Sequence, residues 1–533
     1  MTVARVPYAE TGRFSKAVLD HLSDAPEIRG LRDHAPDLPS LVRAAHARAF
    51  DPAHRAVLVE RLRAQYEGLE QGDAVQRNIE RLAQPDALTV TTGHQLCLFG
   101  GPMYLPFKVL NTVSLAERCT QELGRPVVPV FWMASEDHDR EEIDHTFLNG
   151  ERITWPGQPR GAVGRLRLQG VEQSLEELDA AIGPAPFGPE LLDLARSCYR
   201  SERTLGQATQ AFIHGLFGHH GVLIIDGDDP ALKRFFVPVM EQDLLHGVTH
   251  RAVEHANAVL SEHYKVQAHV RPIDLFYLHQ DRRSRIEQEG DHYRVLDGGP
   301  VFTAAELLVE VRNHPERFSP NVLLRPLYQE TILPNIAYIG GGGELAYWFQ
   351  LKWVFQALQI PMPVLMLRTS AGFLSEKHEQ QWASLGLKVS DLFADRSALR
   401  TRVALERAGA RTDVEQEART LQQLFDALAS RMKQIDPTLE ASARSAQARS
   451  ERVLDGLQHK MERAVRRKES EALARLDKVL DAFIPGGQLQ ERRENLLAEW
   501  SRSGPALFDV LLRELDPLDQ RFTVFVGDPV RGE

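Results

Sequence analysis

Cysteine is scarce in this chain of 533 residues: only three are present, and none belongs to a CxxC pair. A set this small and odd argues against a disulfide framework and against a structural zinc site, and it indicates a reducing compartment. The chain also lacks an apolar run of about 18 residues that could span a membrane. No apolar segment follows the first charged residues, as it would in a signal peptide. These absences predict a cytoplasmic protein with no membrane partner.

Positive charge is in deficit as well. Lys and Arg number 63 against 74 Asp and Glu, so the formal net charge is −11. A protein that binds nucleic acid through its phosphates usually has the opposite balance, so nucleic acid is not an expected partner. Hydrophobic residues make up 43% of the chain and charged residues 26%, which is typical of a globular protein with a large core.

Familiar catalytic signatures are also missing. The chain has no G-x-S-x-G elbow and no H-E-x-x-H helix, so the usual support for a hydrolase or a zinc protease is absent. Nothing near Cys97, Cys119 or Cys198 indicates an activated thiolate, and each is expected to be a small buried apolar residue.

Short apolar segments recur between residues 86 and 395 and alternate with stretches of helical periodicity. Strands buried on both faces belong to parallel sheets covered by helices, so this region predicts an α/β fold with a doubly wound, Rossmann-like core. Two parts are interpreted as insertions, about 150–215 and about 265–305, and the second has the alternating pattern of β-hairpins. The expected buried strands are ALTVTTG (87–93), RPVVPVFWMAS (125–135), GVLIIDGD (221–228), NVLLRPL (321–327) and PVLMLRTS (363–370).

The two ends of the chain have a different character. Residues 1–85 predict a helical segment that packs on the core, and residues 486–533 predict one helix and one strand that return to it. Residues 396–485 carry apolar residues at alternating spacings of four and three, the pattern of a heptad seam. One seam begins at Val414, and a second is interrupted at Lys468. These seams predict an antiparallel coiled-coil hairpin.

The stretch TTGHQLCLFGGPMY (91–104) lies between a predicted strand and a predicted helix, where open α/β sheets bind ligands. Its glycines allow backbone N–H groups to approach an anion, and its polar side chains add donors for a phosphate or a carboxylate. The pattern is neither a Walker loop nor G-x-G-x-x-G, so a tight structural turn is the alternative. The candidate residues here and in the following helix are Gly93, His94, Gln95, Gly100, Gly101, Tyr104 and Lys108.

A second polar stretch, ASEDHDREEIDH (134–145), follows the next predicted strand, so its loop should face the same crevice. Glu136, Asp137, His138 and Asp139 offer a general base, a carboxylate pair for a metal, or acceptors for sugar hydroxyls. Adjacent residues do not share a face, so only some of them can point inward. The alternative is that they are N-cap and first-turn acids of a helix, which the macrodipole favours.

The third stretch, residues 325–355, contains four consecutive glycines between an apolar segment and a predicted helix. A linker is the usual interpretation of a glycine run, but the aromatic and aliphatic neighbours of this one favour a binding loop. The candidate residues are Arg325, Gln329, Glu330, Gly341, Gly342, Gly343, Glu344 and Tyr347.

These stretches resemble a known family. In order along the chain, TTGHQLCLFGGPMY, VPVFWMASEDHDREEI, RPLYQETILPNIAYIGGGGELAYW and PGGQLQERREN (485–495) are similar to the bacillithiol biosynthesis cysteine-adding enzymes. The resemblance implies a core like that of class I nucleotidyltransferases, inserted connecting segments, and a homodimer formed through the carboxy-terminal coiled coil. It also implies a reaction, the joining of the carboxyl of L-cysteine to the amino group of glucosaminyl malate as the last step of bacillithiol synthesis.

The resemblance further implies ATP, with Mg²⁺, as the source of carboxyl activation, and it assigns no certain metal ligand. Many relatives have Gln at the position of His94, which argues against a strict need for an imidazole there. The implied catalytic residues are His94, Glu136, Asp137, His138 and Asp139. The implied binding residues are Thr92, Gly93, Gln95, Gly101, Tyr104, Arg325, Gln329, Glu330, Gly341, Gly343, Glu344 and Tyr347. The stretches themselves add Gly100, Lys108 and Gly342 to the expected binding set.

Two other functions are open on the sequence. One is a degenerate nucleotide-binding scaffold that acts through its coiled coil, although a scaffold has no need of the acids at 136–139. The other is an enzyme like the class I aminoacyl-tRNA synthetases, which needs a basic surface for RNA. The run Arg463, Arg466, Arg467 and Lys468 offers such a surface only locally, and a solvated helix face explains it more simply.

Overall fold

The computed structural model describes residues 2–70, 72–157, 160–279 and 281–527. The chain divides into two compact units, Met1–Gly372 together with Gln488–Glu533, and Phe373–Gly487. The first unit ends earlier than the expected boundary near residue 395. The reason is that α18 (Glu376–Ala383) and α19 (Arg396–Ala408) both pack against α22 (Ser470–Phe483), so the residues before 396 belong to the second unit.

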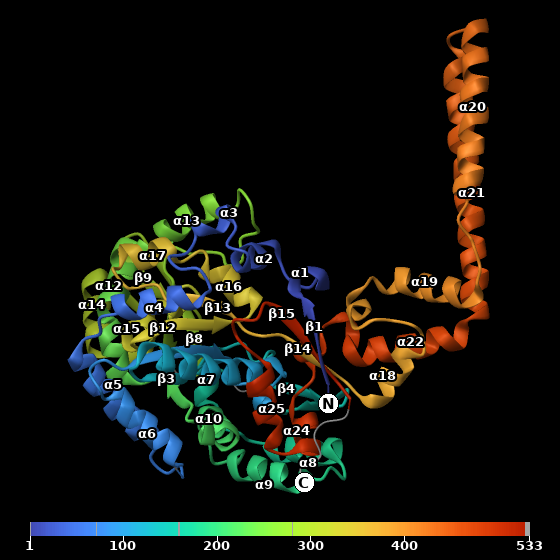
Figure 1. Cartoon of the computed structure of the whole chain (residues 1–533). Helices are drawn as coiled ribbons and strands as arrows, with labels where there is room; N and C mark the ends of the chain where they lie inside the picture. The colour runs from blue at the N-terminus through green and yellow to red at the C-terminus, as the bar shows by residue number, and fades with distance from the viewer. Residues whose placement is uncertain (1, 71, 158–159, 280, 528–533) are drawn as a thin grey trace. The chain divides into compact units, whose positions relative to one another are not determined.

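The first unit is built on a five-stranded parallel sheet (Figure 1). Its order is β13-β12-β2-β3-β6, so the chain moves outward from β2 in one direction and then returns to β2's other side. Ligands bind outside the carboxyl ends of such sheets where the order reverses, here between β2 and β12. The strands are β2 (Leu88–His94), β3 (Val127–Met133), β6 (Leu223–Asp226), β12 (Asn335–Gly340) and β13 (Val364–Leu367).

Helices bury the faces of this sheet. The long helix α7 (Tyr104–Leu123) packs on β2 and β3 and ends at Gly124, whose φ of 64° closes the helix in the left-handed conformation. Leu115 of α7 and Val90 of β2 are each fully buried in one apolar cluster. Burial of such a side chain is worth about 1.5–3 kcal/mol. The expected α/β, Rossmann-like core is confirmed.

One expected strand is wrong. NVLLRPL (321–327) forms a turn and the start of helix α15 (Arg325–Ile332), and the strand is the next apolar segment, β12. The Oδ1 atom of Asn321 accepts the N–H groups of Leu323 at 2.9 Å and Leu324 at 3.1 Å, which starts the turn. Pro326 lies in the first turn of α15, where its missing N–H leaves no helical bond unmade.

The first insertion carries a hairpin followed by two helices. β4 (His145–Leu148) pairs with β5 (Glu151–Thr154) in antiparallel register, so the hairpin begins before residue 150. The helices α8 (Val171–Ile182) and α9 (Gly188–Cys198) follow it. The chain then enters α10 (Leu205–Phe217), which leads to β6.

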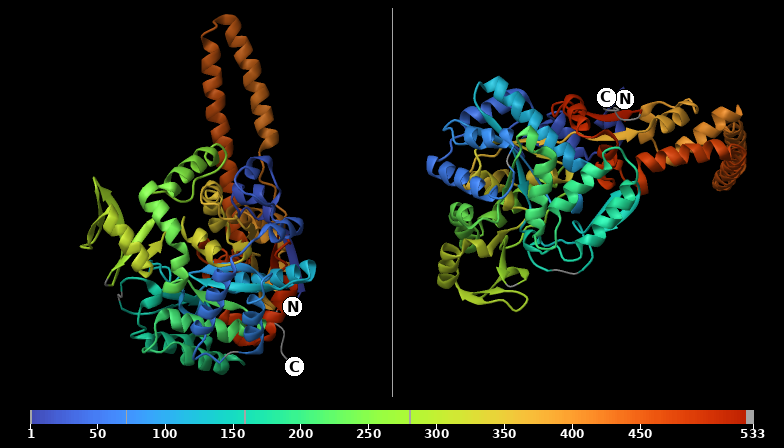
Figure 2. Two further views of the ribbon diagram at one scale, coloured as in Figure 1. Left: turned by 90° about the vertical axis from the view of Figure 1, so that its left-hand side faces the viewer. Right: turned by 90° about the horizontal axis from the view of Figure 1, so that it is seen from below.

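The second insertion forms an antiparallel sheet of order β10-β9-β8-β7-β11, which confirms the hairpins expected at about 265–305. The sheet extends further than expected because its edge strand β11 ends at Pro320. It lies at one side of the first unit in the views of Figure 2. Its strands are β7 (Leu275–His279), β8 (Arg282–Glu289), β9 (His292–Val295), β10 (Val301–Thr303) and β11 (Phe318–Pro320).

The amino and carboxyl ends of the chain meet in the first unit. β1 (Thr2–Pro7), which the sequence did not predict, pairs antiparallel with β15 (Arg521–Val526). The helix α25 (Ala506–Glu514) packs against α7, and the Nδ2 of Asn111 in α7 donates to the Leu515 carbonyl at 3.2 Å. The expected final helix and strand are therefore confirmed.

The other helices and strands are those of the first unit and β14, which runs across its boundary with the second unit. Those of the first unit before β12 are α1 (Tyr8–Thr11), α2 (Lys16–Leu22), α3 (Pro26–Arg29), α4 (Leu38–Ala47), α5 (Pro52–Gln65), α6 (Asp73–Leu82), α11 (Pro230–Lys233), α12 (Val237–His246), α13 (Val248–Leu260) and α14 (Ala304–Asn313). After β12 come α16 (Gly342–Trp348), α17 (Lys352–Ala357), β14 (Ala371–Leu374), α23 (Gln490–Arg493) and α24 (Leu497–Ser503).

The second unit contains the predicted hairpin. Helices α20 (Glu415–Ile435) and α21 (Leu439–Lys468) lie side by side over most of their length (Figures 1 and 2). The second seam was expected to lie on one helix, but the helix breaks at Glu469 (φ −94°, ψ 24°) and continues as α22. The interruption of the seam at Lys468 therefore marks the end of a helix, and the segment 396–485 holds more than a two-helix hairpin.

None of the helices in the described part of the chain has the length and apolar character needed to cross a bilayer. The three cysteines are buried and free of disulfides.

Candidate active site

The first and third polar stretches meet at the point where the strand order reverses. His94 is the last residue of β2 and Gly340 the last of β12. From α7, Lys108 extends its Nζ to 2.9 Å from the Gly93 carbonyl oxygen and forms an ion pair with Glu344, which lies in α16 just beyond β12. Segments more than two hundred residues apart along the chain are thus joined at one place.

Glu344 is held as a carboxylate. One oxygen, Oε1, accepts the Tyr338 hydroxyl at 2.6 Å, and the other accepts the Gly341 N–H at 2.8 Å as well as Lys108. Burial opposes ionisation, but Lys108 and these hydrogen bonds outweigh it and lower the pKa of Glu344 to about 2. Burial lowers the pKa of Lys108, and Glu344 resists that change. Lys108 was expected to hold phosphates, but its charge is already compensated within the protein.

Arg325 lies beside Gly93, where an added Cβ would be 3.7 Å from the Arg325 Nη1. This Nη1 donates to Gln329 Oε1 at 3.1 Å, and the guanidinium lies 5.7 Å from the centre of the Tyr338 ring. Burial raises the pKa of Tyr347, and the nearby Arg325 opposes the rise. Arg325 and Tyr347 therefore belong to the same cluster as Lys108 and Glu344.

Glu330 lies elsewhere. Its Oε1 accepts the side-chain N–H groups of Gln329 and Asn335, each at 2.8 Å. Asn335 is the first residue of β12, so Glu330 lies at the opposite end of that strand from Gly340. Burial raises the pKa of Glu330 to about 7. Glu330 was expected to line the site, but the structure places it inside the core.

His94 lies among aromatic and sulfur atoms. Its ring is perpendicular to that of Tyr104 at 5.1 Å, and its Nε2 is 3.7 Å from the Sγ of Cys97. Burial and, to a smaller degree, the charge of Lys108 lower the pKa of His94 to about 3. The imidazole is therefore neutral near pH 7, and it can exchange hydrogen bonds with a ligand without carrying charge.

Tyr104 also contacts a residue that sequence reasoning missed. The Arg368 guanidinium lies 5.1 Å from the Tyr104 ring centre and forms a two-point ion pair with Glu491, at 2.8 and 2.9 Å. Both charged residues are almost fully buried. Glu491 lies in the stretch PGGQLQERREN, whose run of charged residues after two glycines was the available signal, but nothing in the sequence indicated Arg368 as its partner.

Gly100 and Gly101 form the tight turn of the first stretch, and their N–H groups bind carbonyls of that turn rather than an anion. The N–H groups of Gly100 and Gly101 donate to the carbonyls of Cys97 at 3.0 Å and Leu98 at 3.1 Å. At Gly101 the φ is 65°, and an added Cβ would lie 2.5 Å from that of Cys97. The hydroxyl of Thr92 is also used internally, because it donates to the Ile339 carbonyl at 2.8 Å. These three residues were expected to bind ligand, and the structure shows them holding the chain.

The second stretch divides as expected between inward and outward residues. Asp137 joins it to the first stretch, because its Oδ2 accepts Gln95 Nε2 at 2.5 Å. Its Oδ1 accepts the backbone N–H of His138 at 2.7 Å and lies 3.3 Å from Arg283 Nη1 of β8. His138 and Asp139 are exposed. The antiparallel sheet thus contributes Arg283 to the site, which nothing in the sequence indicated.

Glu136 points into the core beside β6. Its Oε1 lies 2.5 Å from the Nζ of Lys233, which is also 3.2 Å from Asp228 Oδ1. Arg165 binds Asp228 through two nitrogens, at 2.6 and 2.8 Å. Burial raises the pKa of Glu136, although Lys233 opposes the rise. Within the described residues, no group of three or more His, Cys, Asp or Glu side chains is arranged to hold a metal ion.

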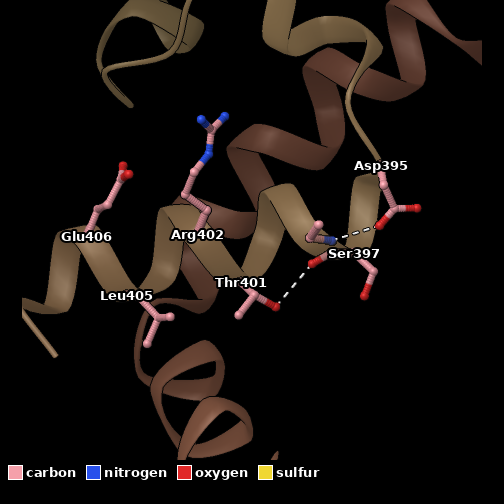
Figure 3. Close-up of a pocket in the computed structure, with 7 residues that line it drawn as sticks. Asp395, Ser397, Thr401, Arg402, Leu405 and Glu406 are labelled. Atoms are coloured by element: carbon pink, nitrogen blue, oxygen red, sulfur yellow. Dashed lines mark hydrogen bonds between the residues drawn. The ribbon is translucent and has the colours of Figure 1, made fainter. Parts of the chain in front are cut away.

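Two hollows lie outside this cluster. One has a volume of about 270 Å³ and borders the site near Pro102 and Arg492. The other runs along α19 in the second unit (Figure 3). In that hollow Asp395 accepts the Ala398 N–H at 2.8 Å, and Thr401 donates to the Ser397 carbonyl at 3.1 Å. These polar groups serve the helix itself, so the hollow along α19 offers no candidate site.

Comparisons with known proteins agree with the expected family. The family model described as "Bacillithiol biosynthesis BshC, N-terminal Rossmann-like domain" matches residues 1–369. The one described as "Bacillithiol biosynthesis BshC, C-terminal coiled-coil domain" matches residues 371–526. A protein of Cytophaga hutchinsonii, provisionally named cysteine ligase BshC, is 37% identical and matches over 97% of both chains. One of the same name from Flavobacterium johnsoniae is 35% identical over 97% of this chain and 98% of its own.

Proposed function

The chain belongs to the bacillithiol biosynthesis BshC family, and on this premise we propose that it joins the carboxyl of L-cysteine to the amino group of glucosaminyl malate, the last step in making bacillithiol. One observation carries the proposal. The stretches shared with the family meet where the strand order reverses, through the Lys108–Glu344 ion pair and the Gln95–Asp137 hydrogen bond. Open α/β sheets bind their ligands at this position.

Amide formation from a free carboxylate needs activation, because the carboxylate oxygen is a poor leaving group. We propose ATP with Mg²⁺ as the source, since it supplies the phosphoryl or adenylyl group that makes this oxygen a leaving group. Lys108, Gly100 and Gly101 are engaged within the protein, so they do not hold the phosphates. Arg325 fits that role better, because its Nη2 is buried in the cluster and has no acceptor among the described residues.

The chain's own residues divide the remaining work. The neutral imidazole of His94 lies at the end of β2, where it can hydrogen bond to the reacting carboxyl. Gln95 and Asp137 lie next to it and offer acceptors. Glu136 is neutralised by Lys233 and supports the loop from inside. Of the four residues 136–139, His138 and Asp139 face solvent, from which the amino group of the second substrate arrives.

The direct test is reconstitution. Purified protein given L-cysteine, glucosaminyl malate and MgATP should yield bacillithiol together with AMP or ADP, detected by mass spectrometry. A strain that lacks the gene should lose bacillithiol and accumulate glucosaminyl malate. Bacillithiol production in that strain, together with no product from the purified protein, would overturn the proposal.

We also propose that the protein acts in the cytoplasm as a homodimer joined through the coiled coil. Apolar side chains on α20 and α21 are exposed in the single chain, among them Leu424 at 62%, Val453 at 62% and Leu457 at 46%. A second copy is the occupant that the family implies for this surface, and its burial would remove these side chains from water. Sedimentation should give twice the chain mass at micromolar concentration, and Leu424→Lys with Val453→Lys should give the single-chain mass. A wild-type protein that sediments as one chain would refute the dimer.

A further inference from the structure

The side chain of Gln95 holds an unused acceptor beside the site. Its Nε2 lies 2.5 Å from Asp137 Oδ2. A carboxylate has no proton to donate, so the amide NH₂ is the end that contacts Asp137, and the amide oxygen is the second terminal atom of the same planar group. This Oε1 is buried and accepts no hydrogen bond within the part of the chain that the structure describes. A buried oxygen without a donor is costly, which indicates a donor that the ligand brings.

Asp137 is a fixed negative charge next to this oxygen. Burial opposes ionisation, but hydrogen bonds from His138 and Gln95 and the charge of Arg283 outweigh it and hold the pKa of Asp137 well below its usual range. Its side chain is 31% exposed, so a small ligand can reach it. A carboxylate this reluctant to take a proton is a poor general base and a good counter-ion.

Arg283 holds the carboxylate in place without occupying its free side. Its Nε donates to Ser319 Oγ at 3.0 Å and its Nη2 to the Pro320 carbonyl at 2.9 Å. The guanidinium also lies 4.0 Å from the centre of the Phe276 ring. These contacts anchor Arg283 to the antiparallel sheet, so it approaches Asp137 from the Oδ1 side, away from Gln95.

We propose that Gln95 Oε1 and Asp137 Oδ2 bind the α-ammonium group of the amino acid that is ligated. An ammonium group carries a positive charge and three donors and accepts nothing, which matches two acceptors of which one is charged. The inference rests on the proposed function, and it selects between its two amine-bearing substrates. The attacking amine of glucosaminyl malate must be uncharged to react, so a strongly anionic carboxylate suits the spectator ammonium of cysteine.

The experiment compares L-cysteine with 3-mercaptopropionate, which has the same thiol and carboxyl but no amino group. Calorimetric titration is carried out under reducing conditions with a non-hydrolysable ATP analogue present. Wild-type protein should bind L-cysteine about 10- to 100-fold more tightly, the factor expected for a charge-assisted hydrogen-bonded group. Gln95→Met and Asp137→Asn should each remove most of this preference. Asp193→Asn, which changes an exposed acid on α9 that has no described contact, should preserve it.

Each result has a defined meaning. An unchanged preference in both site variants overturns the subsite and leaves the ligase proposal intact. Weaker binding of glucosaminyl malate with unaltered cysteine binding in these variants assigns the acceptors to the other amine and also overturns it. If L-serine or L-alanine binds with the same dependence on Asp137 while cysteine does not, the ammonium subsite stands and the proposed substrate fails. No binding of any of these amino acids to wild-type protein overturns the subsite.

Discussion

Two glutamates at opposite ends of strand β12 show what determines the charge of a shielded carboxyl group. Glu344, beyond the carboxyl end, has a pKa of about 2, and Glu330, at the amino end, has one of about 7. Burial alone would raise both. The difference arises because Glu344 has the Nζ of Lys108 directly against its carboxylate. Glu330 accepts neutral amide donors from Gln329 and Asn335, and the nearby charge of Arg48 opposes the effect of burial without overcoming it.

This contrast separates the end of the sheet that carries the candidate site from the opposite end. At the carboxyl end, the charges of Lys108 and Glu344 are paired and fixed in place. At the amino end, Glu330, whose pKa burial raises to about 7, belongs to a hydrogen-bonded network that includes the Asn335 amide and, through it, the Thr91 hydroxyl at 2.9 Å. Preorganised charge is the feature that catalytic sites need, because it requires no rearrangement during the reaction.

Removing Lys108 should reduce the difference in pKa between Glu344 and Glu330. Lys108→Met leaves Glu344 without its cation, and it should lower the free energy of unfolding by about 3–5 kcal/mol, the cost of breaking a buried pair. Because Glu344 is 26% exposed, the lower end of this range is expected. Denaturant unfolding measures the loss. The double variant Lys108→Met with Glu344→Gln is the matched control and should recover most of the stability. A double variant as unstable as the single one would show that packing of Lys108, rather than charge, is lost.

The raised pKa of Glu330 should make the stability of the protein depend on pH. Because the pKa of Glu330 is raised in the folded protein, its proton is retained there when the unfolded chain has already released it. Stability should therefore fall as pH rises from about 4.5 to about 7. Glu330→Gln cannot ionise, so at pH 8 it should be about 2–3 kcal/mol more stable than the wild type and about equal to it at pH 4.5. Urea unfolding at both values decides this, and an equal gain at both would show that ionisation is not the cause.

Most strands of this sheet could be predicted, because a strand buried on both faces appears in the sequence as a short run of strand-favouring residues. RPVVPVFWMAS is apolar on both faces, whereas ALTVTTG alternates Leu88 and Val90 with β-branched threonines, and both are strands. NVLLRPL has the same composition, and only the capping by Asn321 and the place of Pro326 make it a turn and a helix. Residue types in that segment could not distinguish the two outcomes.

The sequence predicted which residues lie in the candidate site better than it predicted the contacts between them. His94, Gln95, Lys108, Asp137 and Glu344 do come together, because each lies at or after the carboxyl end of β2, β3 or β12, and these ends lie side by side. Their partners could not be read from the sequence. The contacts Asp137–Arg283 and Arg368–Glu491 join positions 146 and 123 residues apart, and no local pattern encodes such pairings. The same limit explains why Glu330, which shares α15 with Arg325, was expected in the site although it lies near the amino end of β12.

Two tyrosine hydroxyls allow the comparison to be tested with single hydrogen bonds, where the smallest effects are expected. The hydroxyl of Tyr338 donates to the charged Glu344 at 2.6 Å, and that of Tyr328 donates to the uncharged Gly227 carbonyl at the same distance. Tyr338→Phe should cost about 1–2 kcal/mol and Tyr328→Phe about 1 kcal/mol, because hydrogen bonds to ions are the stronger. Only Tyr338→Phe should raise the folded-state pKa of Glu344. On acidification below about 4.5, the pH-dependent loss of stability should therefore be smaller in this variant and should end at a higher pH than in the wild type or in Tyr328→Phe. Acid unfolding curves of both variants test this, and identical acid limbs would mean that Lys108 alone sets the charge of Glu344.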